Sequence, residues 1–379
     1  MALVLTEEQT MLRDAARDFL NARAPLSHLR QLRDEGVAEG FSRELWAEMV
    51  EMGWAAIIIP ETFGGLDYGY TGLGLVLEET GRTLTPSPLL STAMLGASAL
   101  MLSDNEVACA EWLPQIAAGK KLLAVAFEES DQHRPATVNC SAEPRPSGFT
   151  LNGNKTAVID GHVADAFIVS ARTRRGENLS EGVSLFLVPG DSPGLSMTNT
   201  ELLDNHQSCE IHLDRVSVDR IQLLGPLHGG CPILQKVLDR GRIGMAAEML
   251  GIAQETFERT MQYLKERKQF GVPIGVFQAL QHRAAILFGE IELCKSAILK
   301  ALQAVDEDSD EVPILASLAK AKCGQTAGLA TAEGIQMHGG IGMTDEFDIG
   351  FFIKRWRSLN QQLGDSRYHL DRFATLKGY

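Results

Sequence analysis

The sequence predicts an α+β protein made of several domains, in the order helical, β-rich and helical. With 379 residues the chain is too long for one ordinary hydrophobic core, so two or three packed units are expected. Apolar residues recur at helical spacing up to about Gly119 and again from Ile233, whereas short β-type runs separated by turn residues lie between them. We therefore expect domains at residues 1–120, 121–228 and 229–379.

The first domain is expected to be all-α. Thr6 and Gln9 have the spacing of a capping box, which predicts that a helix begins there. The apolar run 54–61 leads into Gly64-Gly65, which we interpret as a simple loop, because these glycines do not stand between a strand and a helix as in a dinucleotide-binding motif. Further helices are expected at residues 43–52, 72–81 and 89–102.

The second domain is expected to be a small all-β unit. The composition changes near Lys121, and the unit is expected to end near Val218. Asn152-Gly153 is a typical hairpin dipeptide and predicts a tight turn between two strands. The β-type runs are residues 122–127, 149–155, 166–171 and 183–188.

The third domain is expected to be helical. Its first helix runs from about Ile233 to Tyr263 and is stopped by Gly271 and Pro273, so the segment 266–271 is predicted to be a helix-ending loop. The acidic run 306–311 is interpreted as a solvated loop between two more helices. These two helices are expected at residues 277–305 and 313–337, and the second is rich in Ala and Gly, which allows close packing.

Charge and composition exclude several classes of protein. A net charge of -14 disfavours nucleic acid or an anionic membrane as the main partner, because both repel an acidic surface. The N-terminal residues lack the pattern of an export signal, and no window has the roughly 20 apolar residues that span a bilayer. The six cysteines form no metal-type spacing. We expect a cytoplasmic, reduced protein without a metal.

Arg267, Gln269 and Phe270 combine a guanidinium, an amide and an aromatic ring within four residues. Guanidinium binds phosphate oxygens bidentately and Phe offers a stacking face, so these groups suit a diphosphate with flat rings attached. The alternative is a solvated helix end whose positive charges interact favourably with the negative end of the helix dipole. A second candidate is the end of the last long helix, where glycines at 339, 340 and 342 would let a ligand approach the backbone closely.

These two segments resemble motifs of the acyl-CoA dehydrogenases, flavoenzymes that desaturate acyl-CoA thioesters. The run 266–271 is similar to the family's ERKQFG signature, and 336–342 is similar to its Q-x-x-GG-x-G segment. The resemblance extends over the whole chain and implies an all-α N-terminal domain, a β-barrel and a C-terminal four-helix bundle. In the family the first loop crosses a dimer interface and holds the FAD of the neighbouring subunit. The FAD contacts implied are Arg267, Gln269, Phe270, Gln278, Gln336, Gly339 and Gly340, whereas His338 is taken as structural.

The β-unit departs from the family pattern where the family lines the flavin ring. The usual Thr-Glu-Pro turn becomes Glu128-Glu129-Ser130, the Trp-x-Thr step becomes Ala157-Val158-Ile159, and the Gly-Ser-Asp loop is replaced by residues 132–134. Two donor hydroxyls and an aromatic wall are therefore lost. Backbone contacts to FAD from Phe127 and Glu128 need no particular side chain, so cofactor binding is still expected.

The resemblance also assigns a substrate site and leaves the catalytic base missing. Asp239 and Arg242 match the family's acyl-CoA contacts, with an exposed i,i+3 ion pair as the alternative. The position of the family's catalytic Glu is Leu363, and its second known position corresponds to Gly241. The nearest acidic residues are Asp365, at a cofactor-contacting position, and Glu248. Neither is an obvious base.

The missing base resembles the base-less subunit of bacterial acyl-CoA dehydrogenase heteromers that act on steroid-derived CoA thioesters. This implies an FAD-dependent oxidoreductase subunit of lipid or steroid degradation. It would act in a homo- or heterotetramer and pass electrons to an electron-transfer flavoprotein. Two alternatives stay open: a structural partner that has lost the cofactor, and a flavin monooxygenase or oxidase on the same scaffold.

Overall fold

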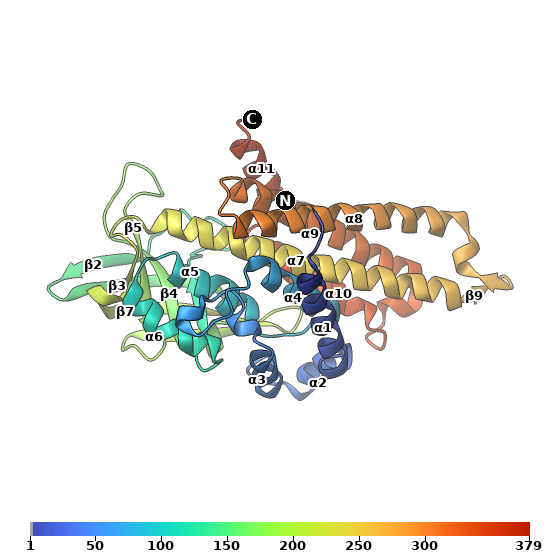
Figure 1. Ribbon diagram of the computed structural model, residues 1–379, viewed down its shortest axis with the longest axis horizontal. Coiled ribbons are helices and arrows are strands. Elements are labelled where there is room, and N and C mark those ends of the chain that lie inside the picture. Colours follow the sequence, from blue (N-terminus) through green and yellow to red (C-terminus); the bar gives the residue numbers. More distant parts are fainter. Residues whose placement is uncertain (1–2) are drawn as a thin grey trace. The chain divides into compact units, whose positions relative to one another are not determined.

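The computed structural model describes residues 3–379, which form two compact units (Figure 1). One, called here the helical unit, comprises the described residues up to Glu35 together with Tyr70–Pro86 and Arg242–Tyr379. The other, the sheet unit, comprises Gly36–Gly69 and Ser87–Gly241. Along the sequence the order is helical, sheet and helical, which confirms the predicted fold class. In the described part of the chain, no helix has the length and apolar character to cross a membrane.

The helical unit is built from long helices that begin close to the predicted residues. Thr6 and Gln9 form the predicted capping box of the first helix. In chain order the elements are α1 (Glu7–Arg23), α2 (Leu26–Glu35), α4 (Tyr70–Thr83), α7 (Gly230–Glu266), which starts in the sheet unit, β9 (Lys268–Gln269), β10 (Val272–Pro273), η6 (Ile274–Val276), α8 (Gln278–Asp306), α9 (Val312–His338), η7 (Gly339–Met343), α10 (Ile349–Gln361) and α11 (Ser366–Leu376).

Helices α4 and α7 pack at van der Waals distance because glycines stand at their crossing. A Cβ atom on Gly81 would lie 2.0 Å from the carbonyl oxygen of Glu248, and one on Gly251 would lie 1.8 Å from that of Glu78. Both distances are far inside contact range, so neither position accepts a side chain without moving a helix. The crossing brings α1, α4 and α7 together.

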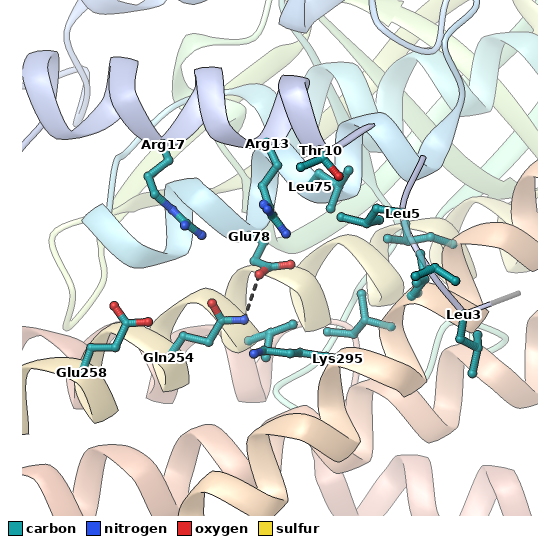
Figure 2. Close-up of a pocket in the computed structure, with 15 residues that line it drawn as sticks. Leu3, Leu5, Thr10, Arg13, Arg17, Leu75, Glu78, Gln254, Glu258 and Lys295 are labelled. Atoms are coloured by element: carbon teal, nitrogen blue, oxygen red, sulfur yellow. Dashed lines mark hydrogen bonds between the residues drawn. The ribbon is translucent and has the colours of Figure 1, made fainter. Parts of the chain in front are cut away.

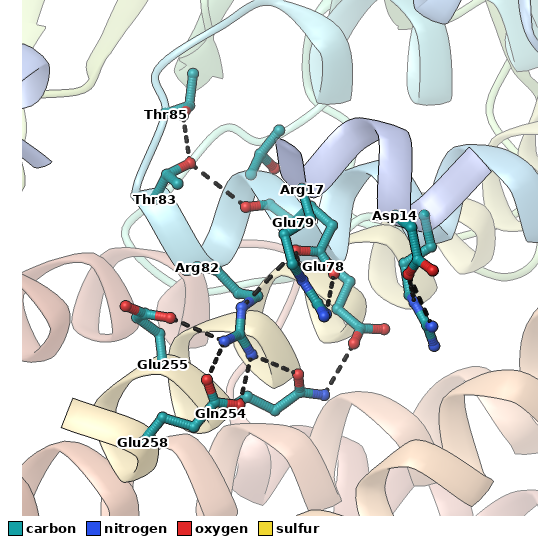
Figure 3. A network of polar contacts seen from close by, with 12 residues as sticks. Asp14, Arg17, Glu78, Glu79, Arg82, Thr83, Thr85, Gln254, Glu255 and Glu258 are labelled. Carbon is teal, nitrogen blue, oxygen red and sulfur yellow. Dashed lines mark hydrogen bonds and ion pairs between the residues drawn. The ribbon is translucent and has the colours of Figure 1, made fainter. Parts of the chain in front are cut away.

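A network of charged side chains joins these three helices (Figure 3). The guanidinium of Arg17 donates to both carboxylate oxygens of Glu79, at 2.8 and 3.0 Å, and this bond raises the pKa of Arg17. Arg82 bonds to Gln254 at 2.9 Å and pairs with Glu255 at 3.0 Å. Paired charges and amides therefore join the three helices and help to fix how they align.

Asp306 also contributes to this packing. The acidic run that begins with it was interpreted as a solvated loop, but the Asp306 carboxylate accepts hydrogen bonds from the backbone N–H groups of Tyr70, at 2.6 Å, and Thr71, at 3.0 Å. It thus caps the N-terminus of α4 from a distance of more than 200 residues in sequence. Asp306 is exposed, as expected of a solvated position, but it is the last residue of α8 rather than part of a loop. Its capping role could not be predicted, because a cap supplied by a distant segment leaves no local pattern.

The sheet unit contains an eight-stranded sheet with short helices. The strand order is β6-β7-β3-β2-β4-β5-β8, and β1 pairs with β4. Its interior is apolar, with Leu151, Phe167 and Phe186 fully buried. The elements are α3 (Arg43–Glu51), η1 (Trp54–Ala56), η2 (Glu61–Phe63), the π-helical η3 (Leu89–Gly96), α5 (Ala97–Met101), α6 (Glu106–Ala117), β1 (Leu123–Ala126), β2 (Ser141–Arg145), β3 (Gly148–Ile159), η4 (Gly161–Val163), β4 (Ala166–Arg172), β5 (Val183–Pro189), β6 (Leu195–Glu201), β7 (Gln207–Asp219), η5 (Arg220–Gln222) and β8 (Leu223–Leu224).

The predicted hairpin turn at Asn152-Gly153 is wrong. Strand β3 continues through both residues, and the hairpin between β2 and β3 turns at Pro146-Ser147 instead. Gly153 stands where the pairing of β3 with β7 shifts register, with φ of 145°, and a Cβ there would lie 2.7 Å from the Cα of Cys140. The glycine therefore marks a β-bulge and a close backbone approach, both of which use the same residue type as a turn.

Candidate functional site

The segment that resembles the ERKQFG signature follows the end of α7, as expected of a helix-ending loop, and forms a small exposed β-hairpin. Helix α7 ends at Glu266, and Gln269 pairs with Val272 across a two-residue turn. The turn residues Phe270 and Gly271 have φ of 54° and 80°, as in a type I′ turn. A left-handed conformation is unfavourable for Phe, and its side chain is 91% exposed. An aromatic ring held in this way at a hairpin tip is available to a ligand or a partner.

The glycine-rich end of α9 lies at the same end of the helical unit as this hairpin. The rings of Tyr263, near the end of α7, and His338, at the end of α9, have centroids 4.3 Å apart. The Tyr263 hydroxyl donates to the carbonyl oxygen of His338 at 3.3 Å. His338 is buried, donates through Nδ1 to the carbonyl oxygen of Gly334 at 2.6 Å, and has a pKa lowered by burial. It packs the two helix ends together, in keeping with a structural role.

The side chains and glycines at this end of the unit suit a dinucleotide phosphate. Arg267 and Gln269 are exposed on the hairpin, and Gln278 is exposed at the first turn of α8. Gln336 is exposed as well, and a Cβ on Gly339 or Gly340 would meet no atom within 4 Å. The backbone at these glycines is therefore open to close approach by a ligand, with a guanidinium fork on the neighbouring hairpin. All seven predicted contacts at this end of the unit are exposed, whereas Asp365, the eighth in the unit, is half-buried.

In the sheet unit, the structure brings together the two segments that depart from the family pattern. The backbone N–H of Thr156 donates to the carbonyl oxygen of Glu128 at 2.9 Å, which places Ala157 beside the end of β1. Ala157 has φ of 50° at a second irregularity in the pairing of β3 with β7. Phe127 is buried, and the Glu128 carboxylate contacts the imidazole of His133. The Glu128 side chain thus bonds within the loop that follows β1.

A buried ion pair that sequence reasoning missed fastens the same loop. Lys155 is fully buried and donates to the Glu129 carboxylate at 2.7 Å and to the Ser170 hydroxyl at 2.9 Å. Glu129 also accepts bonds from the backbone N–H groups of Asn139, at 2.6 Å, and Cys140, at 3.0 Å. The signal was a lysine within a β-type run, which alternation would otherwise place as a solvated residue. The pair anchors the 128–140 loop to strands β3 and β4.

The two predicted substrate contacts on α7 are buried. Asp239 is 2% exposed and Arg242 is 0% exposed. The alternative of an exposed ion pair is therefore excluded. A buried guanidinium needs several acceptors, and Arg242 donates through Nε to the carbonyl oxygen of Leu363 at 3.2 Å. This bond joins the predicted substrate residue to the predicted base position.

Leu363 lies in the turn between α10 and α11 and has an unusual backbone. Its φ is 56° and that of Gly364 is 97°, while the Leu363 side chain is 4% exposed. Asp365, the neighbouring acidic residue, caps α11: its carboxylate accepts a bond from the backbone N–H of Tyr368 at 2.8 Å. The carboxylate of Asp365 is therefore engaged in capping the helix.

Glu248 forms a buried ion pair. Its carboxylate accepts a hydrogen bond from Nε of Arg355 at 2.6 Å, and the two side chains are 4% and 8% exposed. Moving the Glu248 carboxylate toward a substrate would break its bond to the buried guanidinium of Arg355, which is costly. The structure thus gives Glu248 a packing role between α7 and α10.

A cavity of about 530 Å³ also lies in the helical unit (Figure 2). Its polar side chains include Arg13, Arg17 and Glu78, and burial raises the pKa of Glu78. Leu250, Ile298 and Leu302 are among its apolar residues. None of the predicted cofactor, substrate or base positions lines this cavity. In residues 3–379, no group of three or more His, Cys, Asp or Glu side chains is placed to hold a metal ion.

Comparisons with known proteins identify relatives over nearly the whole chain. Three family models match: Acyl-CoA dehydrogenase, N-terminal domain over residues 6–120, middle domain over 128–216 and C-terminal domain over 228–375. A probable acyl-CoA dehydrogenase of Bacillus subtilis is 31% identical over 356 residues, which cover 92% of each chain. The caffeyl-CoA reductase-Etf complex subunit CarC of Acetobacterium woodii is 29% identical, again over 92% of each chain. A solved structure of a Tcur3481-Tcur3483 steroid ACAD variant has a TM-score of 0.87 and 31% identity, with 98% of each chain covered.

Proposed function

The chain belongs to the acyl-CoA dehydrogenase family, and we propose that it is an FAD-dependent subunit without a catalytic base of its own. The observation that carries this proposal is Leu363. It occupies the turn position where the resemblance places the family's catalytic Glu, and an alkyl side chain cannot accept a proton. The two nearest acidic residues, Asp365 and Glu248, are engaged in a helix cap and a buried ion pair.

The chemistry of the family explains why this matters. Desaturation removes a proton from the α-carbon of an acyl-CoA while a hydride leaves the β-carbon, and FAD, when bound, accepts the hydride. An α-proton beside a thioester is only weakly acidic, so a carboxylate must be held within hydrogen-bond reach of it. With Leu363 at this position, the chain has to obtain the base from a partner subunit.

We propose that this chain's role is to hold FAD and acyl-CoA. Arg267 and Gln269 on the β9–β10 hairpin would bind the diphosphate, and Phe270 would stack on a ring. Gln278, Gln336, Gly339 and Gly340 would complete this part of the site, while Phe127, Glu128 and Asp365 would contribute elsewhere along the cofactor. Asp239 and Arg242 would contribute to the acyl-CoA site. The exposure of the hairpin and the open backbone at Gly339 and Gly340 support the first of these assignments.

Exposed apolar side chains support a partner subunit. Besides Phe270, three residues of α8 stand out in solvent: Ile286 is 63% exposed, Phe288 54% and Leu293 57%. Ile286 and Leu293, seven residues apart, share one face of α8, and exposed apolar side chains that share a face are typical of an interface. We propose a tetramer with a related, base-bearing dehydrogenase subunit in the cytoplasm. The names of two relatives, an Etf-complex subunit and a two-component steroid ACAD, support an electron-transfer flavoprotein as acceptor and a bulky, steroid-like acyl group.

Co-expression tests this proposal. The chain is purified alone and together with a family member that carries the Glu, and subunit stoichiometry, flavin content and turnover are measured. We expect a flavin-containing heterotetramer whose turnover is lost when the partner's base is changed to Gln. A homo-oligomer with full turnover, purified from the native host, would contradict the proposal.

The same measurements separate the two alternatives. A heterotetramer in which this chain contributes to no flavin site would indicate a structural partner. Reduced flavin that reacts rapidly with oxygen would indicate a monooxygenase or oxidase, for which the lack of a base is no handicap.

A further inference from the structure

The turn between α10 and α11 has a costly backbone conformation at Leu363. A left-handed conformation is unfavourable for a residue with a Cβ, and Leu has no side-chain polar group to offset the cost. Such strain persists only where the surroundings over-determine the backbone. The hydrogen bonds around the turn show what determines it.

Three buried side chains from α7, α9 and α11 converge on the carbonyl groups of this turn. Nε of Arg242 and Nε2 of His369 both donate to the carbonyl oxygen of Leu363, at 3.2 and 3.0 Å. Nζ of Lys320 donates to the carbonyl oxygens of Leu359 at 2.8 Å, Asn360 at 3.3 Å and Gly364 at 3.0 Å. The three donor side chains are each 0% exposed.

All five of these bonds end on the main chain, and none needs the side chain of residue 363. A lysine with three carbonyl acceptors is fully satisfied without a carboxylate. Burial lowers the pKa of Lys320 to about 7 and that of His369 to about 2, so the imidazole is neutral and its Nε2 carries the proton that it donates. The shape of the turn therefore comes from its surroundings.

We propose that Lys320, Arg242 and His369 are positioning residues, which fix the backbone at position 363 and with it the direction of the side chain there. A carboxylate placed at this position would then allow the lone chain to take the α-proton. This inference rests on the proposed function. By this proposal, the chain keeps all the residues that position a base and lacks only the carboxylate. The alternative is that the cluster merely joins three helices, in which case the residue at 363 has no defined direction.

Leu363→Glu, with Leu363→Gln as the isosteric control, tests the proposal. Each protein, loaded with FAD, is given straight-chain and steroid acyl-CoAs in D2O under anaerobic conditions. Deuterium incorporation at the α-carbon is followed by NMR and flavin bleaching by absorbance. Because a positioned base contributes about 10²–10⁴-fold, we expect at least a roughly 100-fold increase in both rates for L363E and none for L363Q. Equal rates in the two variants, with FAD and acyl-CoA bound, would overturn the proposal.

A second variant tests whether Lys320 fixes the backbone at position 363. Lys320→Met is added to L363E, and Lys322→Met, on the same helix with its amine bonded to Glu290 of α8, is the matched control. We expect the gained rate to fall by at least about tenfold only with K320M, on the scale of a misplaced general base. Crystal structures give a readout that does not depend on activity: φ at position 363 should stay positive in L363E and change when K320M is added. An unchanged φ and rate with K320M would refute the role of Lys320.

These results are distinguishable from failure of the proposed function. If the wild-type chain alone bleaches its flavin, a base exists elsewhere and the proposed function fails. The crystallographic comparison of L363E with L363E/K320M still decides whether Lys320 fixes φ at position 363.

Discussion

Replacing Glu248 by glutamine would leave the buried guanidinium of Arg355 without its carboxylate. Both side chains are at most 8% exposed and their N–O distance is 2.6 Å. Removing one partner of such a pair costs about 3–5 kcal/mol, because the remaining charge stays desolvated. An unfolding entropy of roughly 2.1 cal/mol/K per residue gives about 0.8 kcal/mol/K for this chain, so we expect Tm to fall by about 4–6 °C. Glu248→Gln should behave in this way whether or not acyl-CoA is present.

Thermal unfolding of the single variants Glu248→Gln and Arg355→Met and of the double variant measures this directly. The double variant should lose less than the sum of the two single losses, because both single changes remove the same interaction. Glu39→Gln, which breaks an exposed ion pair with Arg43 at 3.0 Å, is the control and should cost at most about 0.5 kcal/mol. If Glu248→Gln leaves Tm unchanged but abolishes flavin reduction, Glu248 is the base and the packing role is wrong.

Three further changes test other parts of the structure. Gly251→Ala, whose Cβ would lie 1.8 Å from a backbone oxygen of α4, should lower the free energy of unfolding in denaturant by about 2 kcal/mol or more. Gly350→Ala, with open space around it, is the control and should be neutral or stabilising. Equal effects of the two changes would argue against the close crossing of α4 and α7. Arg267→Ala should weaken FAD binding about 10- to 100-fold by fluorescence titration and Lys268→Ala less than about threefold, and the reverse order would remove the assigned phosphate contact. Burial lowers the pKa of His369 from 6.5 to about 2, so below pH 6.5 the unfolded chain binds more protons than the folded chain, and stability falls as the pH drops through that range. His369→Asn should flatten this part of the Tm–pH curve. An unchanged slope would be inconsistent with a neutral buried imidazole.

Periodicity and local punctuation were enough to predict the order of helical and β-rich segments. The capping box at Thr6 formed as expected, because a cap is specified within four residues. The turn at Asn152-Gly153 did not form, because the same dipeptide also suits a β-bulge and only the partner strand decides between them. Local signals therefore identify the kind of residue that a backbone irregularity needs, but not which irregularity it is.

The long-range pairs of the candidate site could not be predicted. Lys155 and Glu129, Arg355 and Glu248, and Lys320 and the turn after α10 are each separated by 26 residues or more in sequence. A charged residue within an apolar pattern indicates only that a partner must exist, because burying an unpaired charge is costly. Which residue is the partner depends on the packing of whole helices.

The most direct test of the central claim is the visible spectrum of the purified, FAD-loaded chain alone as acyl-CoAs are added anaerobically. With Leu363 at the base position, we predict that the flavin band shifts on binding but does not bleach, and that it bleaches once a base-bearing partner subunit is added. Bleaching in the lone chain would contradict the account, because a base would then have to exist among this chain's own residues.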